Sequence, residues 1–122
     1  MSDNEQTIRN FIDAWPRLDV AEIVGFFAED GIYHNMMLDP VKGHEALTSF
    51  IGSFANGWSD VKWELLNIAS AGNLVFAERV DRMTVGGKSV ALPCCGVFEM
   101  ESGKIKSWRD YFDLGTFTGT TG

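Results

Sequence analysis

Two short runs of charged and aromatic residues carry the side chains that can do chemistry in this chain. The first is ERVDR at 78–82, and the second is WRDYFD at 108–113. Both runs suit a strand, and a strand sends alternate side chains to one face, so Arg79 and Asp81 share a face. If Asp110 shares the matching face of its own strand, the interior holds two carboxylates and a guanidinium. Burying such a set rarely stabilises a protein, so we expect it to serve acid and base catalysis.

The residues around these charges favour an inward position for them. The apolar run at 74–77 looks buried on both faces and leads directly into Arg79 and Asp81, which leaves Glu78 and Arg82 as the solvated set. The alternative is a surface ion pair on an edge strand, which contributes little to stability.

The second carboxylate, Asp110, lies between Trp108 and Phe112 in a period-two pattern and is expected to point inward with them. Its alternative is a carboxylate satisfied by nearby backbone donors. Tyr33 and Asn35 share a face of a short strand, and their hydroxyl and amide can together fix a water molecule. Core packing with a turn contact is the alternative for that pair.

The remaining reactive residue types give no second candidate site. His34 points away from Tyr33 on its strand, and His44 is expected to face solvent at a helix start. The adjacent Cys94 and Cys95 point to opposite faces and are interpreted as small buried apolar residues. The sequence has no phosphate-binding glycine loop and no zinc-ligand spacing, so we predict that it needs neither a metal nor an organic cofactor.

Hydrophobic spacing predicts the elements that must position these side chains. Helices are expected from a capping box at Ser2 to Pro16, from Asp19 with Phe27 on its inner face, and over 43–56. A turn is expected at Asp30-Gly31, before a short strand at 32–36. The later strands are expected at 61–70, 73–84, 89–101 and 104–112, with tight turns at 71–73, 86–88 and 102–104.

This element order predicts an α+β fold in one domain over residues 1–122. A curved, mixed, mostly antiparallel sheet would wrap around the helices and form a conical pocket. At 122 residues the chain can bury a core without disulfides or a structural metal.

Composition narrows the class of partner. The net charge of −7 argues against a nucleic acid or an anionic membrane surface, and 12% aromatic residues suit a pocket for a small apolar molecule. The amino-terminal residues lack the basic-then-apolar pattern of a signal peptide, so we expect a cytoplasmic protein.

Several motifs together resemble the limonene-1,2-epoxide hydrolase family. They are ERVD at 78–81, GVF at 96–98, GKI at 103–105, WRDYFD at 108–113 and the pattern Tyr-x-Asn-Met at 33–36. The resemblance spans nearly the whole chain and implies the cystatin-like cone of the nuclear transport factor 2-like superfamily.

The resemblance also implies an activity, which is hydrolysis of a small cyclic epoxide to a vicinal diol in one step. By this resemblance Asp110 corresponds to the general base, and Tyr33 and Asn35 hold the water molecule that it activates. Asp81 corresponds to the acid, and Arg79 corresponds to the bridge between the two carboxylates. It further implies a homodimer, with an apolar epoxide and water as substrates.

Two other classes stay open at this point. A ketosteroid-isomerase-like or polyketide-cyclase-like enzyme of the same fold would keep one carboxylate as a base and would not need the set of three charges. A non-catalytic binding module would tend to lose the polar interior altogether.

Overall fold

A mainly helical half precedes a run of long strands in the computed structural model, which describes residues 3–36 and 38–113. In chain order the elements are α1 (Asp3–Ala14), η1 (Trp15–Arg17), α2 (Val20–Val24), β1 (Phe27–Asn35), β2 (Val41–Lys42), α3 (His44–Ala55), β3 (Trp58–Ala71), β4 (Leu74–Val85), β5 (Lys88–Glu101) and β6 (Lys104–Phe112).

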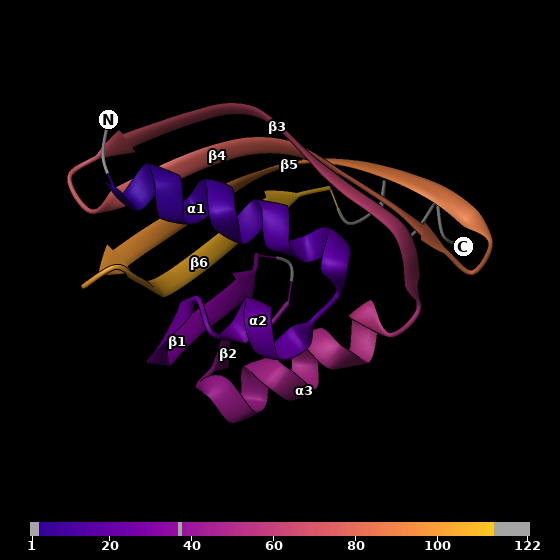
Figure 1. The fold of residues 1–122 in the computed structure, drawn as a ribbon, viewed down its shortest axis with the longest axis horizontal. Coiled ribbons are helices and arrows are strands. Elements are labelled where there is room, and N and C mark those ends of the chain that lie inside the picture. Colours follow the sequence, from indigo (N-terminus) through magenta and orange to yellow (C-terminus); the bar gives the residue numbers. More distant parts are fainter. Residues whose placement is uncertain (1–2, 37, 114–122) are drawn as a thin grey trace.

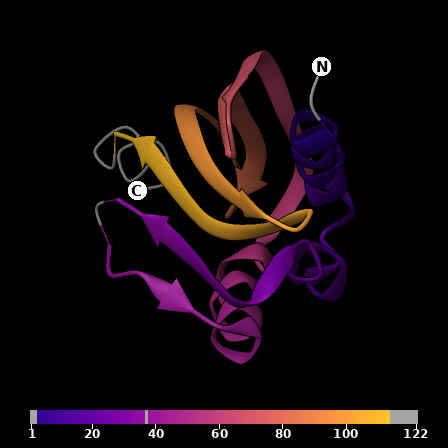
Figure 2. The same ribbon diagram turned by 90° about the vertical axis from the view of Figure 1, so that its left-hand side faces the viewer.

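The described strands form one curved sheet in the order β2-β1-β6-β5-β4-β3. Within it, β1 and β6 pair in parallel and the other neighbours pair antiparallel. The helices lie against its concave side, with α1 along β3 and α3 beside β1 (Figures 1 and 2). The predicted α+β fold with a curved, mixed, mostly antiparallel sheet is therefore confirmed.

The helices form where apolar residues recur at helical spacing, and α1 buries Ile8, Phe11 and Ile12. Asp19 caps α2, because its side chain accepts a hydrogen bond from the backbone N–H of Glu22 at 3.2 Å. The predicted capping residue Ser2 lies outside the described residues. No helix in the described part of the chain has both the length and the apolarity needed to cross a bilayer.

Two expectations for the segment after α2 are wrong. Phe27, predicted on the inner face of the second helix, begins β1, because the neighbouring Phe26 carbonyl accepts a hydrogen bond from Ile105 N–H at 2.9 Å. Asp30 and Gly31, predicted as a turn, lie inside β1 where its pairing with β6 shifts. A Cβ at Gly31 would lie 3.0 Å from the Ile105 carbonyl oxygen, so the glycine lets the strand bend there without ending.

A two-residue turn, Gly86–Gly87, joins β4 to β5. Its φ angles of 58° and 80° lie in the left-handed region that favours glycine. The strand residues on either side of this turn pair directly, and that pairing places Arg79 opposite Cys94. The turn therefore decides which β5 side chain lies next to the arginine.

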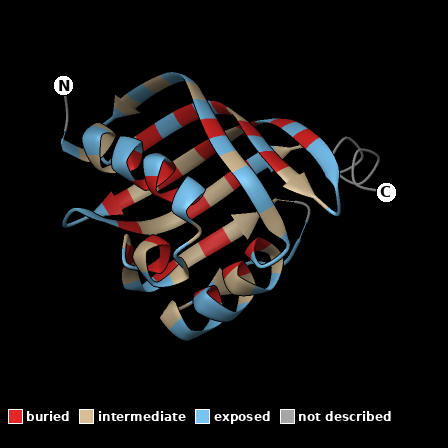
Figure 3. Cartoon of the chain, turned by 45° about the vertical axis from the view of Figure 1, so that its right-hand side comes forward, coloured by how far each residue is buried: buried red, intermediate tan, exposed pale blue. Residues whose placement is uncertain are grey.

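Large aromatic side chains fill the core between the helices and the sheet. Those that are almost fully buried are Phe11, Trp15, Phe27, Phe98 and Trp108. Figure 3 shows how buried and exposed positions alternate along the helices and strands.

Burial alternates along β4, where Val75 and Ala77 are buried but Phe76 is 37% exposed. The prediction that 74–77 is buried on both faces is wrong, because the helices cover only the concave face of the sheet (Figure 1). Arg79 points inward because it shares the covered face of β4 with Val75 and Ala77.

Candidate active site

Three charged side chains meet inside the concave face of the sheet. Arg79 and Asp81 come from β4 and Asp110 comes from β6; Arg79 has no exposed surface, and each aspartate is 4% exposed. The structure thus brings together the three charges that the strand pattern placed inward. Glu78 and Arg82, the flanking charges on β4, are exposed on its other face.

The guanidinium of Arg79 bridges the two carboxylates. Its Nε donates to Asp81 Oδ1 at 3.0 Å, and its Nη2 donates to Asp81 Oδ2 at 3.0 Å and to Asp110 Oδ2 at 2.8 Å. Its Cζ lies 4.8 Å from the ring centroid of Trp63 and 5.6 Å from that of Trp108. The cation is therefore compensated by charge and by aromatic faces, which makes its burial tolerable.

The two carboxylates are not equivalent. Both oxygens of Asp81 accept hydrogen bonds from Arg79. Asp110 Oδ1, in contrast, is buried and has no hydrogen-bond partner among the described residues. A buried acceptor without a partner costs free energy, so Asp110 is poised to accept a proton or a hydrogen bond from a bound molecule.

Burial raises the pKa of Asp81 above its ordinary value, since the opposing effect of Arg79 is smaller and the charge of Asp110 adds to the rise. Burial alone would lower the pKa of Arg79, but Asp110 and Asp81 outweigh it and raise that pKa well above the usual range. The site therefore favours a proton on Asp81 and a permanently charged arginine.

Tyr33 and Asn35 reach the site because β1 runs parallel to β6. In that pairing Asn35 lies opposite Asp110, and Tyr33 lies opposite Trp108, on which its ring stacks at a centroid distance of 4.1 Å. Burial, with the charge of Asp110 next in size, raises the pKa of Tyr33 well above its usual range, so the hydroxyl stays neutral. A hydroxyl and an amide thus lie next to the carboxylate that has a free oxygen.

An apolar cavity of about 210 Å³ opens above the charged residues. Its polar wall includes Tyr33, Asn35, Asp81 and Asp110. Its apolar wall is formed by Leu38, Phe50, Phe54, Trp58, Trp63, Met83, Leu92 and Phe112. The volume is below the roughly 300–1,000 Å³ of sites for drug-sized ligands, so the cavity suits a small apolar molecule with one reactive polar atom.

Sequence comparison identifies the family of this chain. Residues 2–121 match the protein family that is described as "Limonene-1,2-epoxide hydrolase catalytic domain". The chain belongs to the limonene-1,2-epoxide hydrolase family. The match confirms the resemblance drawn from the motifs on β4, β5 and β6.

Two epoxide hydrolases are similar to this chain, with identical residues at about a quarter of the aligned positions. Epoxide hydrolase EphG of Mycobacterium tuberculosis (strain ATCC 25618 / H37Rv) is 27% identical over 107 residues, which are 88% of this chain and 71% of that protein. The structure of an M. tuberculosis LEH-like epoxide hydrolase superposes with a TM-score of 0.84 at 25% identity and covers 97% of this chain and 89% of that one.

A further solved structure shows how widely the fold is used. It is the epoxide hydrolase/cyclase-like enzyme SalBIII, which acts in pyran ring formation in the polyether salinomycin. It superposes with a TM-score of 0.83 at 20% identity and covers 93% of this chain and 92% of that one. At this identity the likeness concerns the fold alone.

Cys94 is a residue of the site that the sequence interpretation missed. It is buried like a small apolar residue, as expected, but Arg79 Nη2 donates to its Sγ at 3.1 Å, and burial raises its thiol pKa far above the ordinary value. Its neighbour Cys95 is only half-buried and lies on the other face of β5. Counting residue pairs back from the turn at Gly86 would have placed Cys94 beside Arg79.

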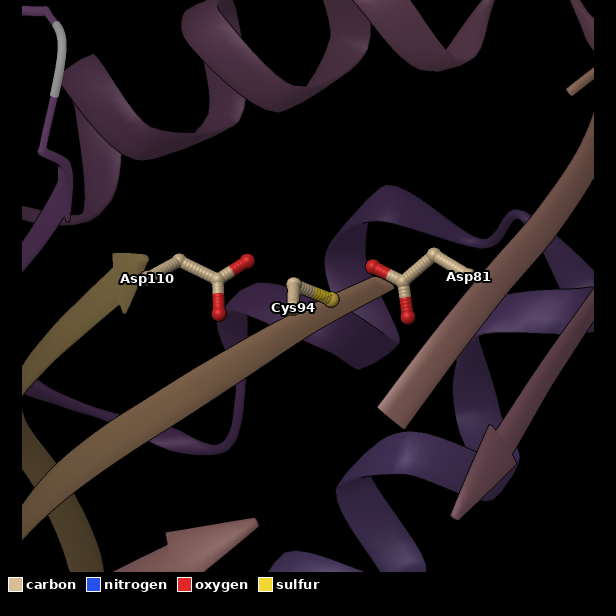
Figure 4. A group of neighbouring side chains, drawn as sticks. All are labelled: Asp81, Cys94 and Asp110. Carbon is tan, nitrogen blue, oxygen red and sulfur yellow. The ribbon is translucent and has the colours of Figure 1, made fainter. Parts of the chain in front are cut away.

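Asp81, Cys94 and Asp110 point toward one another from three neighbouring strands, and the sulfur lies between the carboxylates (Figure 4). One polar atom of each lies within 4.8 Å of the others, a grouping that the sequence spacing did not indicate. Arg79 Nη2, however, already lies 2.8–3.1 Å from an atom of each of the three. The guanidinium therefore takes the place that a metal ion would need.

The two histidines lie outside the cavity wall described above. His34 is half-buried on β1 and alternates with the cavity-facing Tyr33 and Asn35. His44 was expected to face solvent, but it is half-buried, and its Nε2 lies 2.9 Å from the Phe27 carbonyl oxygen. That ring ties the start of α3 to β1 and is not positioned to act on a molecule in the cavity.

Gly96 makes room for the arginine. It lies opposite Asp110 on β5, and a Cβ there would lie 2.7 Å from Arg79 Nη1 and 2.8 Å from Trp108 Nε1. Because both neighbours are fully buried, we expect Gly96→Ala to lower the free energy of unfolding by about 1–3 kcal/mol. Urea unfolding measures this loss.

The matched control for this prediction is Gly52→Ala. Gly52 lies in α3 with open space around its missing Cβ, so alanine there should leave stability unchanged or raise it slightly. Equal stability of the Gly96→Ala variant and the unaltered chain would contradict the packing argument.

Proposed function

We propose that this chain hydrolyses a small epoxide to a vicinal diol by general acid and base catalysis, using protein side chains alone. The observation that carries the proposal is the buried set of Asp81, Arg79 and Asp110, in which both carboxylates face the same apolar cavity. Membership of the limonene-1,2-epoxide hydrolase family supports it.

In this mechanism Asp110 is the base. Its unpartnered Oδ1 takes a proton from a water molecule held by Tyr33 and Asn35, and the water oxygen attacks a carbon of the epoxide ring. The neutral hydroxyl and the amide can each accept from or donate to that water, which orients its lone pair toward the substrate.

Asp81 is the acid in the same step. As the ring C–O bond breaks, Asp81 gives its proton to the epoxide oxygen, so no unprotected alkoxide forms. Its raised pKa supports this role, because an ordinary aspartate would already be ionised near neutral pH. Asp81 loses one proton to the epoxide oxygen and Asp110 gains one from water. The net charge of Asp81, Asp110 and Arg79 together therefore stays constant.

The cavity favours a compact cyclic substrate of the limonene-epoxide type. Its wall is mainly apolar, and its volume of about 210 Å³ leaves room for few atoms beyond a ring and small substituents.

We further propose that the protein acts as a cytoplasmic homodimer. The exposed apolar side chains Leu66, Phe76 and Tyr111 supply apolar surface for an interface between subunits.

A single turnover in water enriched in oxygen-18 tests the mechanism. With enzyme in excess over cyclohexene oxide, we expect the heavy oxygen to appear in the diol of the first turnover, because the nucleophile is water and not a carboxylate. Mass spectrometry of the diol and of the intact protein measures where the label goes. Spontaneous hydration, measured without enzyme, is the control.

Three outcomes would contradict the proposal in different ways. Unlabelled diol with label in an aspartate would mean covalent catalysis by that side chain. An isomer or an internal cyclic ether formed without uptake of label would favour the isomerase or cyclase class. Binding of the epoxide with no turnover would favour a binding module.

A further inference from the structure

The sulfur of Cys94 lies at a junction of hydrogen bonds that the mechanism above does not use. The β4–β5 pairing places Cys94 opposite Arg79, and the side chain is 7% exposed. Its Sγ accepts from Arg79 Nη2 at 3.1 Å and lies within 4.8 Å of a carboxylate oxygen of Asp81. In Figure 4 the sulfur points toward Asp81 from between the two carboxylates.

Counting hydrogens shows that this junction has more acceptors than donors. Arg79 Nη2 carries two hydrogens but lies within hydrogen-bond distance of three acceptors, which are Asp81 Oδ2, Asp110 Oδ2 and Cys94 Sγ. When all three are acceptors, they compete for the two hydrogens. When a proton sits on Asp81 Oδ2, that oxygen becomes a poor acceptor, and the second hydrogen is free for the sulfur.

We propose that Cys94 is a positioning residue for the acid: its sulfur accepts the free Nη2 hydrogen while Asp81 holds its proton, and its S–H donates to Asp81 after the proton has gone to the substrate. The proposal rests on the acid role of Asp81 proposed above. A thiol suits both states because it is a weak acceptor and a weak donor. The arginine can therefore keep one position through the reaction.

The weak S–H donor also bears on how easily Asp81 keeps its proton. A hydrogen bond to an ionised carboxylate is stronger than one to its neutral form, so a donor at position 94 lowers the pKa of Asp81. The other charged or titratable groups that act on Asp81 are Arg79 and Asp110, with Tyr33 near Asp110. A stronger donor than S–H should make Asp81 release its proton at lower pH.

Two variants of nearly equal shape separate hydrogen bonding from packing. Cys94→Val removes both hydrogen-bonding functions, and Cys94→Thr replaces the thiol with a stronger hydroxyl donor; both residues suit a strand. The activity should fall at alkaline pH as Asp81 loses its proton. We expect the pH of half-maximal activity on the alkaline side to rise by about 0.5 unit in Cys94→Val and to fall by a similar amount in Cys94→Thr, relative to the unaltered chain.

Cys95→Ser is the matched control, because Cys95 is the next residue on β5 and lies on the opposite face. It should leave the pH profile unchanged. If valine or threonine prevents folding, Cys94→Ala and Cys94→Ser form a second pair with the same predicted signs. Thermal unfolding of each variant reports its stability separately.

Carbon-13 NMR titration of the aspartate carboxyl groups tests the same inference without turnover. In the free protein, the pKa of Asp81 should follow the order valine above cysteine above threonine at position 94. This measurement distinguishes failure of the inference from failure of the proposed reaction. An Asp81 pKa that is unchanged in both variants, or that shifts in the same direction in both, would overturn the role of Cys94.

Discussion

Asp110→Asn and Asp81→Asn are each expected to lower the rate of epoxide hydrolysis at least about a hundredfold. Asparagine keeps the shape of the side chain, but at position 110 it cannot take a proton from water, and at position 81 it has no acidic proton to give. The measurement is kcat/KM for cyclohexene oxide, with circular dichroism to verify folding.

The double variant gives a sharper test of a concerted step. If Asp110 and Asp81 act in one transition state, the double variant should be little worse than either single variant, because removing one partner already removes the shared step. Additive losses would indicate two independent steps.

The matched control for both substitutions is Glu78→Gln on the same strand. Glu78 is exposed on the outer face of β4 and accepts a hydrogen bond from Asn67. Glutamine at position 78 should therefore leave the rate within about twofold of that of the unaltered chain. Near-normal rates in Asp110→Asn or Asp81→Asn would remove that residue from the proposed mechanism.

Arg79→Met is expected to lower the free energy of unfolding by about 3–5 kcal/mol near neutral pH. The arginine has no exposed surface and is the cation between two buried carboxylates, which methionine would leave facing each other without compensation. Denaturant unfolding at several pH values measures the effect.

The loss should depend on pH in a defined direction. Arg79 lowers the pKa of Asp81, so its removal raises further a folded-state pKa that burial already places above the unfolded value. A carboxyl group of this kind contributes stability that is present at low pH and is lost as pH rises through its folded-state pKa. The Arg79→Met variant should therefore be more stable near pH 4 than near pH 8.

A triple variant tests the cause of that instability. Adding Asp81→Asn and Asp110→Asn to Arg79→Met removes the uncompensated charges, so the triple variant should be more stable at pH 8 than Arg79→Met alone. It should also lose the dependence on pH that Asp81 causes. A triple variant no more stable than the single one would mean that packing, and not charge, is the main contribution of Arg79.

The strand period by itself determined that Arg79 and Asp81 share one face of β4. Residues two positions apart lie on the same face of a strand, so Arg79 and Asp81 had to share a face whatever covered it. The run at 74–77 was not needed for this conclusion, and the two-sided burial assigned to it was wrong at Phe76. The local turn signals at 86–87 were also sufficient to join β4 to β5 as a hairpin.

The position of Cys94 beside Arg79 can be predicted from the sequence. A two-residue turn at Gly86–Gly87 fixes the pairing of every residue in the hairpin, including that of Cys94 with Arg79. The residue type of a cysteine predicts burial well but says nothing about which polar group lies opposite it on the next strand.

Only the tertiary structure decided how Tyr33 and Asn35 reach the charged residues of the site. β1 and β6 are about seventy residues apart in the chain, and their parallel pairing places Asn35 beside Asp110 and Tyr33 on Trp108. No turn joins these two strands, so no local rule sets their register. Closure of the cavity depends on the same distant pairing, because α3 packs against β1 and supplies Phe50 and Phe54 to the cavity wall.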